Sequence, residues 1–278
     1  MGIILTMNKH LRNSPSLVLV RVWLVIPGGG VFLMHKYFVR VVMLVMVLAF
    51  SSSARAQSEP ESRWSAEAGI GWDNGISGNI NSSAIGTLNN QTVVILKNKY
   101  EDVYGTGLHL RFGGGYMYKE DTELRVTFTF QSIDADLTPM GDLGVSNLYG
   151  QYDDYQSLGI DFGIRRYARL NSFLRGYGEG AIGLAFIDET DVVLAAPQAN
   201  FTGTATDFYD KTSAFTFGFN LGLAFAVHPR ADAFTQIGIR YVSGMSDVDA
   251  LNATGLGSIN DKSSRWAMPF ISGLRFKF

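Results

Sequence analysis

Eight segments of the chain alternate between apolar and polar positions with a period of two, the pattern of a β-strand with one apolar face. They lie near residues 63–74, 102–117, 122–133, 155–167, 172–187, 213–227, 232–243 and 264–278. The sixth segment is the clearest, because one of its faces consists of Phe215, Phe217, Phe219, Leu221, Leu223, Phe225 and Val227. No helical spacing of apolar residues competes, and residues 57–278 contain no run of 18 apolar residues. We therefore expect an all-β chain.

The connections between these segments alternate in length. Those at 119–121, 168–171 and 229–231 are tight, whereas the other four are stretches of about twenty residues rich in Gly, Asn, Ser, Thr and Asp. Long connections without structure are rare in compact soluble domains, but outer-membrane barrels combine an even strand number with short periplasmic turns and long extracellular loops. Residues that pair directly across a symmetric hairpin share a face, so their numbers must both be odd or both be even. The polar positions of the segments flanking each of the three tight connections meet this requirement. The sequence thus predicts an eight-stranded antiparallel up-and-down transmembrane β-barrel with short periplasmic turns and long extracellular loops.

The bulky side chains decide which face of this barrel is outside. An eight-stranded barrel has an interior only just wide enough for side chains to fill, so a row of large apolar residues on each strand must point outward. We expect that face to contact lipid, and the face of Gly, Ala, Thr and charged residues to line the lumen. Trp266 and Phe276 lie ten residues apart on the apolar face. At a rise of ~3.3 Å and a tilt of ~45° this separation is roughly 23 Å, which fits the apolar band of such barrels.

The first 56 residues have the pattern of a targeting region. A basic stretch around Lys36 precedes the apolar run 41–50, and residues 54–56 read Ala-Arg-Ala, an A-x-A cleavage site. The apolar run is shorter than the ~20 residues that a membrane-spanning helix needs. We expect residues 34–56 to be a cleaved signal peptide and residues 57–278 to be the barrel domain. Residues 1–33 are then an extended leader or the result of a start codon assigned too early.

Charge is unevenly distributed along the chain. Residues 1–56 contain six Lys/Arg and no acid, which leaves 17 basic against 25 acidic residues in 57–278. Nucleic-acid binding needs a basic surface, so we expect no nucleic-acid partner. The chain has no cysteine, which excludes disulfides, thiolate metal sites and a cysteine nucleophile.

The A-x-A signal, the eight segments, the alternating connection lengths and the C-terminal Phe276-Lys277-Phe278 resemble the outer membrane protein A-like family of small transmembrane β-barrels. The resemblance covers residues 63–278 and is architectural. It implies residence in the bacterial outer membrane, and recognition of Phe276 and Phe278 by the barrel-assembly machinery as an assembly signal. Some members of the family continue into a periplasmic peptidoglycan-binding domain, whereas this chain stops after the eighth segment, so we do not expect cell-wall anchoring.

Charged residues gather at the positions expected to face the lumen. Arg at the lipid midplane costs roughly 2–4 kcal/mol, and unpaired buried charges cost far more than paired ones, so these side chains should point inward and pair. The simpler interpretation is a static ion-pair network that fills the barrel and fixes its register. A gate or narrow polar conduit is the alternative. The expected network consists of Glu67, Arg111, Glu123, Arg125, Asp161, Arg165, Arg175, Glu179, Arg240 and Arg275.

The chemistry-bearing residues predict no catalytic, cofactor or metal site. Residues 178–183 match G-x-G-x-x-G, but that fingerprint requires a helix after the glycines, and residues 184–186 continue a strand pattern. Some small outer-membrane barrels modify lipids, and such an enzyme would need a His near a Ser and a carboxylate. His109 falls on the lumen face and His228 at a tight turn, on opposite ends of the barrel. We therefore expect neither a catalytic nor a metal-binding histidine, and no enzymatic activity.

The long connections are acidic, since 134–154, 188–211 and 244–263 contain 5, 5 and 3 Asp/Glu. No calcium-loop pattern is present, so these are either solvated loops facing a lipopolysaccharide layer or a binding surface for an extracellular ligand. We expect an integral outer-membrane protein with a structural, adhesive or surface-recognition role, in contact with outer-membrane lipid and lipopolysaccharide. A narrow channel for small solutes is the alternative, and a lipid-modifying enzyme is the least favoured.

Overall fold

The computed structural model describes residues 63–248, 255–260 and 263–278. The expected leader (1–33), signal peptide (34–56) and cleavage site lie outside these described residues. Within them the chain is almost entirely β-structure, and its helices are α2 (Tyr100–Val103) and the 3-10 turn η2 (Pro197–Ala199). No helix among these residues is long and apolar enough to cross a membrane.

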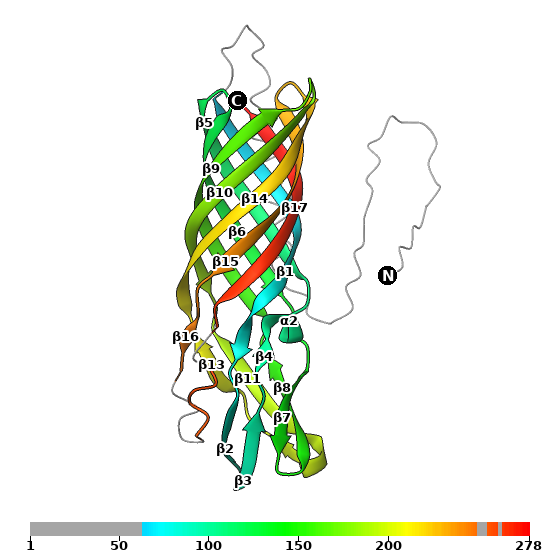
Figure 1. The fold of residues 1–278 in the computed structure, drawn as a ribbon, viewed down its shortest axis with the longest axis vertical. Helices are drawn as coiled ribbons and strands as arrows, with labels where there is room; N and C mark the ends of the chain where they lie inside the picture. Colours follow the sequence, from blue (N-terminus) through cyan, green and yellow to red (C-terminus); the bar gives the residue numbers. More distant parts are fainter. Residues whose placement is uncertain (1–62, 249–254, 261–262) are drawn as a thin grey trace, which may run out of the picture. The chain divides into compact units, whose positions relative to one another are not determined.

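Eight long strands in the described part of the chain form a closed antiparallel barrel (Figure 1). They are β1 (Trp64–Asn81), β5 (Gly107–Lys119), β6 (Thr122–Ile133), β9 (Tyr155–Arg169), β10 (Leu174–Ile187), β14 (Thr212–His228), β15 (Ala231–Val242) and β17 (Arg265–Lys277). Each strand pairs with the next along the chain, and β17 pairs with β1 from Ser65↔Lys277 to Gly78↔Arg265. This closure joins the two edges of the sheet. The predicted eight-stranded antiparallel up-and-down barrel is confirmed.

Tight turns connect the barrel strands at one end, which we call the turn end; the opposite end is the loop end. Lys119 pairs with Thr122 across the first turn, and His228 pairs with Ala231 across the third. The chain also finishes at the turn end, where the amide of Phe278 donates a hydrogen bond to the carbonyl of Trp64 (3.0 Å). The three short connections predicted from the sequence therefore lie together at one end of the barrel.

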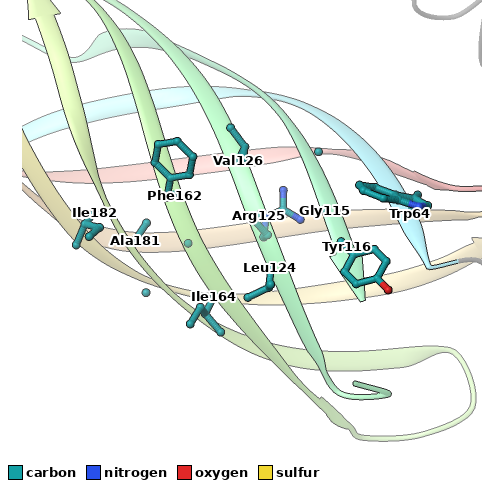
Figure 2. Close-up of a pocket in the computed structure, with 13 residues that line it drawn as sticks. Trp64, Gly115, Tyr116, Leu124, Arg125, Val126, Phe162, Ile164, Ala181 and Ile182 are labelled. Atoms are coloured by element: carbon teal, nitrogen blue, oxygen red, sulfur yellow. The ribbon is translucent and has the colours of Figure 1, made fainter. Parts of the chain in front are cut away.

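The apolar face of the barrel strands points outward, as the size of its side chains predicts. Phe128 on β6 and Phe219 on β14 are 55% and 48% exposed, whereas the alternate residue Thr127 is buried inside. Figure 2 shows part of this outward face, on which Phe162 and Ile164 also stand. Soluble monomers rarely expose apolar patches of this extent, so the surface suits a hydrocarbon environment.

Aromatic side chains stand near both ends of the outward face. Trp64 and Tyr116 lie at the turn end with their ring centroids 4.9 Å apart. Toward the loop end, Tyr241 lies 5.2 Å from Trp266. Two aromatic girdles that flank an apolar band are typical of outer-membrane barrels, because the amphipathic rings settle at the membrane–water interfaces.

The long connections differ from the expected irregular loops, because they form a second β-sheet at the loop end (Figure 1). Its strands are β2 (Ala84–Leu88), β3 (Gln91–Ile95), β7 (Thr138–Leu143), β8 (Ser146–Tyr152), β11 (Thr190–Ala196), β12 (Phe201–Thr202), β13 (Thr206–Asp210) and β16 (Ser246–Asp247). They are ordered β16-β13-β11-β8-β7-β3-β2, with β12 paired to β11. The short strand β4 (Asn98–Lys99) pairs with the far end of β1. We call this structure the loop-end sheet.

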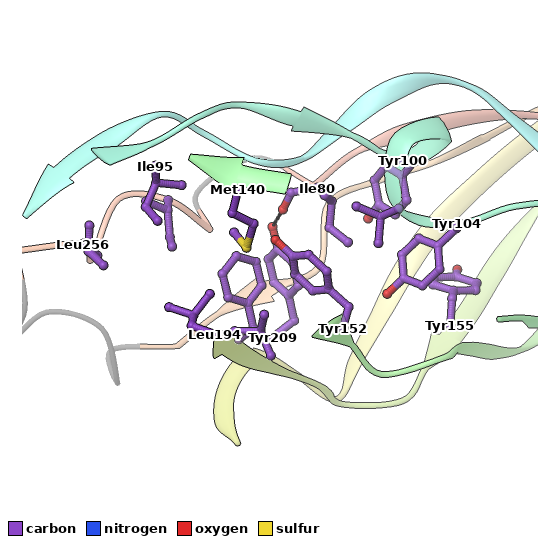
Figure 3. Packing of buried hydrophobic residues seen from close by; sticks show 14 of the residues in the cluster. Ile80, Ile95, Tyr100, Tyr104, Met140, Tyr152, Tyr155, Leu194, Tyr209 and Leu256 are labelled. Atoms are coloured by element: carbon purple, nitrogen blue, oxygen red, sulfur yellow. Dashed lines mark hydrogen bonds between the residues drawn. The ribbon is translucent and has the colours of Figure 1, made fainter. Parts of the chain in front are cut away.

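The loop-end sheet encloses a hydrophobic core of its own (Figure 3). Val93, Met140 and Phe208 are fully buried in it. The hydroxyl groups of four of its buried tyrosines donate hydrogen bonds, and that of Tyr209, for example, donates to the carbonyl of Ile80. Burying a Val, Met or Phe side chain contributes roughly 1.5–3 kcal/mol, so this core stabilises a folded structure at the loop end.

Candidate functional site

The barrel lumen contains a group of five charged side chains from five adjacent strands, which we call the central cluster. Glu67 comes from β1, Arg111 from β5, Arg125 from β6, Arg165 from β9 and Glu179 from β10. Arg165 reaches both carboxylates, with Nη1 3.0 Å from Glu67 Oε2 and Nη2 2.7 Å from Glu179 Oε2. Arg111 Nε lies 3.1 Å from Glu67 Oε1, and Arg125 Nε lies 3.2 Å from Glu179 Oε2.

Each carboxylate of the central cluster contacts all three guanidinium groups, since Arg111 also pairs with Glu179 and Arg125 with Glu67. None of these five side chains is more than 6% exposed. Buried charges are tolerated only when they are paired and hydrogen-bonded. The cluster has one guanidinium in excess, and Glu123 offsets it, with Oε2 3.1 Å from Arg125 Nη1.

A second group of charges, the turn-end cluster, extends the pairing toward the turn end of the barrel. It consists of Glu123, Arg175, Asp232, Arg275 and Lys277. Arg275 joins its two acids, with Nη2 2.7 Å from Glu123 Oε1 and Nη1 3.4 Å from Asp232 Oδ2. Lys277 Nζ lies 2.9 Å from Asp232 Oδ1, and Arg175 pairs with Asp232 Oδ2. The ion pairs therefore run without a break from the centre of the lumen to the turn end.

A separate ion pair lies on the loop-end side of the central cluster. Arg240 Nη2 is 3.2 Å from Asp161 Oδ2. The hydroxyl of Thr216 donates to Asp161 at 2.8 Å, and Arg240 Nη1 donates to the hydroxyl of Thr129 at 3.3 Å. These bonds tie four barrel strands together across the lumen, since the residues come from β9, β15, β14 and β6.

A buried arginine lies at the junction between the lumen and the loop-end core. The guanidinium of Arg265 stacks over the ring of Tyr155 at 3.9 Å and lies 5.5 Å from the ring of Tyr100. Its Nη2 donates to the side-chain oxygen of Gln131 (3.3 Å), and Gln131 donates in turn to Asp73. Cation–π contacts of this kind strengthen when they are desolvated. Arg265 thus links the polar lumen to the aromatic side chains of the loop-end core.

Glycines opposite large side chains let the lumen fill. A Cβ on Gly222 would lie only 2.3 Å from the ring of Tyr177, and one on Gly115 would lie 2.1 Å from Glu123 Oε1. The Tyr177 ring in turn packs against the guanidinium of Arg165 at 4.2 Å. An eight-stranded barrel is just wide enough for side chains to fill, and this pairing of large residues with glycine occupies its cross-section.

The ten charged residues expected in the lumen all occupy inward positions, but they divide into the two clusters and the Asp161–Arg240 pair. Arg175 pairs with Asp232, a residue outside the expected network. The expected network left out Asp73, Asp232, Arg265 and Lys277, all of which the structure places in the lumen or at its turn end. Each of them has the parity of its strand's polar face, so a complete count of charged residues by parity would have included them.

The lumen also brings a serine, a histidine and a carboxylate together around one glutamine. Ser157 donates to the side-chain oxygen of Gln131 at 3.0 Å, and Gln131 Nε2 lies 3.3 Å from His109 Nδ1 and contacts Asp73. All of these groups are buried in the part of the lumen next to the loop-end core. His228 lies instead at a turn-end hairpin, where its Nδ1 accepts a hydrogen bond from the amide of Arg230 (3.2 Å). Among residues 63–248, 255–260 and 263–278, no three His, Cys, Asp or Glu side chains are placed to hold a metal ion.

A hollow of about 870 Å³, the outer groove, interrupts the outward face near the turn end (Figure 2). Two outward-facing glycines lie within it. A Cβ on Gly180 would meet no atom within 4 Å, and one on Gly114 would meet only the Ser65 carbonyl at 3.8 Å. The groove therefore exists because side chains are missing there. Its other lining residues are Trp64, Gly115, Tyr116, Leu124, Arg125, Val126, Phe162, Gly163, Ile164, Ala181 and Ile182.

No protein-family model matches the chain, and no curated protein matches its sequence. Several solved structures are similar at low identity. Neisserial surface protein A has 12% identity and a TM-score of 0.41, over 79% of this chain and 100% of that one. Ail, the attachment invasion locus protein of Yersinia pestis, has 13% identity and a TM-score of 0.33 in complex with the heparin analogue sucrose octasulfate, over 77% and 99% of the two chains. The outer membrane protease OmpT from Escherichia coli has 9% identity and a TM-score of 0.41, over 81% and 100%. Likenesses this distant concern the architecture alone.

Proposed function

We propose that the chain is an integral protein of the bacterial outer membrane, with a closed barrel as its anchor and the loop-end sheet as a surface for recognition or adhesion. The outward apolar face and its two groups of aromatic side chains support a membrane location. In hydrocarbon every backbone polar group must be bonded within the protein, and the pairing of β17 with β1 meets that requirement for the wall of the barrel.

The observation that carries the proposal is the way the lumen is filled. Ion pairs occupy it from the turn end to Arg240, and Arg265 with its tyrosine partners occupies the junction with the loop-end core. A channel would require these buried pairs to separate, and breaking a buried pair by removing one partner costs roughly 3–5 kcal/mol. A structural and recognition role therefore fits the barrel better than solute transport.

A group of acidic side chains on the loop-end sheet favours a ligand with positive charge. Asp191 on β11 is directly opposite Asp207 on β13, and the amide of Asp191 donates to Asp153 Oδ2 at 3.3 Å. Partial burial raises the pKa of Asp191, and repulsion from Asp153, Asp207 and Glu189 raises it further. A cationic ligand would relieve this repulsion. Candidate partners are a basic protein segment or the divalent cations of a lipopolysaccharide layer.

The same proposal assigns partners to the barrel itself. The apolar band would contact outer-membrane lipid and lipopolysaccharide, and Phe276 with Phe278 would present the end of β17 to the barrel-assembly machinery. Enzymatic lipid modification is the weaker alternative. His109 and Ser157 are both buried in the filled lumen, away from the outward face where a lipid substrate would lie.

Cysteine labelling should reveal the orientation that the proposal requires. The chain has no native cysteine, so single substitutions give a clean signal. Val145→Cys, at a fully exposed turn of the loop-end sheet, should react with a membrane-impermeant maleimide in intact cells. The matched variant Glu120→Cys, in a turn-end hairpin, should react only after the outer membrane is permeabilised. The reverse pattern would contradict the proposed orientation, and protection of both sites in intact cells would contradict the outer-membrane location.

A further inference from the structure

The outer groove lies on the outward face at a place where a smooth barrel would carry side chains. Gly180 and Gly114 both have ordinary backbone angles, since neither is among the glycines with positive φ. Gly180 has open space around its missing Cβ and Gly114 nearly so, so neither conformational need nor close packing requires glycine. What the two glycines provide is the hollow itself. Its volume of about 870 Å³ lies within the range of small-molecule sites.

The walls of the groove are apolar and its end near the turn end is aromatic. Leu124, Phe162 and Ile164 line the body of the groove, and Trp64 and Tyr116 lie at one end of it (Figure 2). Rings of this kind are enriched where the hydrocarbon of a membrane meets its headgroups. The groove therefore runs from the apolar band to the level of the headgroups at the turn end.

Positive charge stands beside the aromatic end of the groove. Arg63 is exposed, and its Nη1 donates to the hydroxyl of Tyr116 at 3.4 Å. Lys119 follows on the same strand as Tyr116, with its ammonium 5.7 Å from the ring centre of Tyr118. Within the described residues, neither Arg63 nor Lys119 has a carboxylate at ion-pair distance. Arg166, also at this end, is already paired with Asp121 at 3.0 Å.

We propose that the outer groove binds one phospholipid with a net negative headgroup, its acyl chain lying over Gly114 and Gly180 and its phosphate near Arg63 and Lys119. The inference rests on the proposed function, which places the turn end at the periplasmic leaflet. An apolar hollow that leads to two cations matches a molecule with an apolar tail and an anionic head. A second copy of this chain would bring the same cations to the contact, and like charges there would oppose it.

Native mass spectrometry of the full chain in neutral detergent tests this inference. The probes are phosphatidylglycerol and phosphatidylcholine with identical acyl chains. The wild-type protein should retain one phosphatidylglycerol more strongly than phosphatidylcholine. Gly180→Leu, which fills the groove, should weaken retention of both lipids about tenfold, because a leucine side chain displaces several methylene contacts. Arg63→Ala should lower only the preference for phosphatidylglycerol.

Gly176→Leu is the matched control, because Gly176 faces outward on the same strand but lies outside the groove lining. It should bind lipid like the wild type. Heat-modifiable migration on gels checks that each variant is folded. Equal lipid retention by Gly180→Leu and Gly176→Leu would overturn the proposed site, as would a dimer whose formation Gly180→Leu abolishes. Failure here with the cysteine-labelling pattern intact would reject the lipid site alone, whereas a reversed labelling pattern would reject the orientation on which it rests.

Discussion

Replacing Glu179 with alanine should lower the free energy of unfolding of the barrel by about 3–5 kcal/mol, because it leaves positive charge uncompensated among three buried guanidinium groups. Glu179 contacts Arg111, Arg125 and Arg165, and its side chain is only 2% exposed. Glu67 would then be the only carboxylate shared by these three arginines. Reversible urea unfolding in lipid vesicles, followed by tryptophan fluorescence, measures the change.

A matched control separates buried from exposed pairing. Glu101 forms an ion pair with Lys99 at 2.8 Å, but both side chains are roughly half exposed. Exposed pairs contribute little to stability because water screens them, so Glu101→Ala should leave the urea midpoint nearly unchanged. Equal midpoints for Glu179→Ala and the wild type would mean that water, and not a carboxylate, solvates the arginines of the central cluster.

Deleting Phe276, Lys277 and Phe278 should sharply reduce the yield of folded protein in the outer membrane. These residues lie at the seam that closes the barrel, where Phe276 pairs with Ala66 on one side and Ala231 on the other. Their loss would leave the end of β1 unpaired in lipid, where each unsatisfied backbone group costs several kcal/mol. It would also remove the aromatic end that we propose as the assembly signal. Immunoblots of membrane fractions measure the yield.

A substitution in the loop-end sheet and a double substitution in β17 are the controls for this deletion. Asp247→Asn alters an exposed strand of the loop-end sheet and should leave the yield unchanged. Phe276→Leu with Phe278→Leu keeps the backbone pairing but removes both aromatic rings, so it separates barrel closure from recognition of the signal. Normal yield and heat-modifiable migration for the deletion would contradict the role of β17 as the closing strand.

The barrel could be predicted from the sequence because each of its strands is long enough to show a period of two. The strands β6 and β14 match the segments expected at 122–133 and 213–227 to within a residue. The loop-end sheet was missed because its strands have seven residues or fewer and their turns resemble ordinary loops. Asn89 and Asn90, both with positive φ, join β2 to β3. A two-residue type I′ hairpin turn needs positive φ at both central residues, and Asn tolerates that conformation, so this Asn pair could have revealed the turn.

The lumen site was predictable as a set of residues but not as a set of contacts. Parity along a strand says that Arg175 and Glu179 face inward. Which acid Arg175 reaches depends on the stagger of strands around the barrel, and that stagger brings Asp232 of β15 to it instead. The outer groove was also beyond sequence reasoning. Gly114 and Gly180 are distant in the chain, and only the folded barrel places both glycines in the lining of one hollow.

Electrical recording in planar lipid bilayers tests the filled lumen most directly. Protein of the full chain is reconstituted, its folding is checked by heat-modifiable migration, and currents are recorded across a range of voltages. The ion pairs from the turn end to Arg240, and the Arg265 junction beyond them, predict no stable conductance steps from folded protein. Regular, voltage-independent steps from folded wild-type protein would contradict a filled lumen and favour a channel for small solutes.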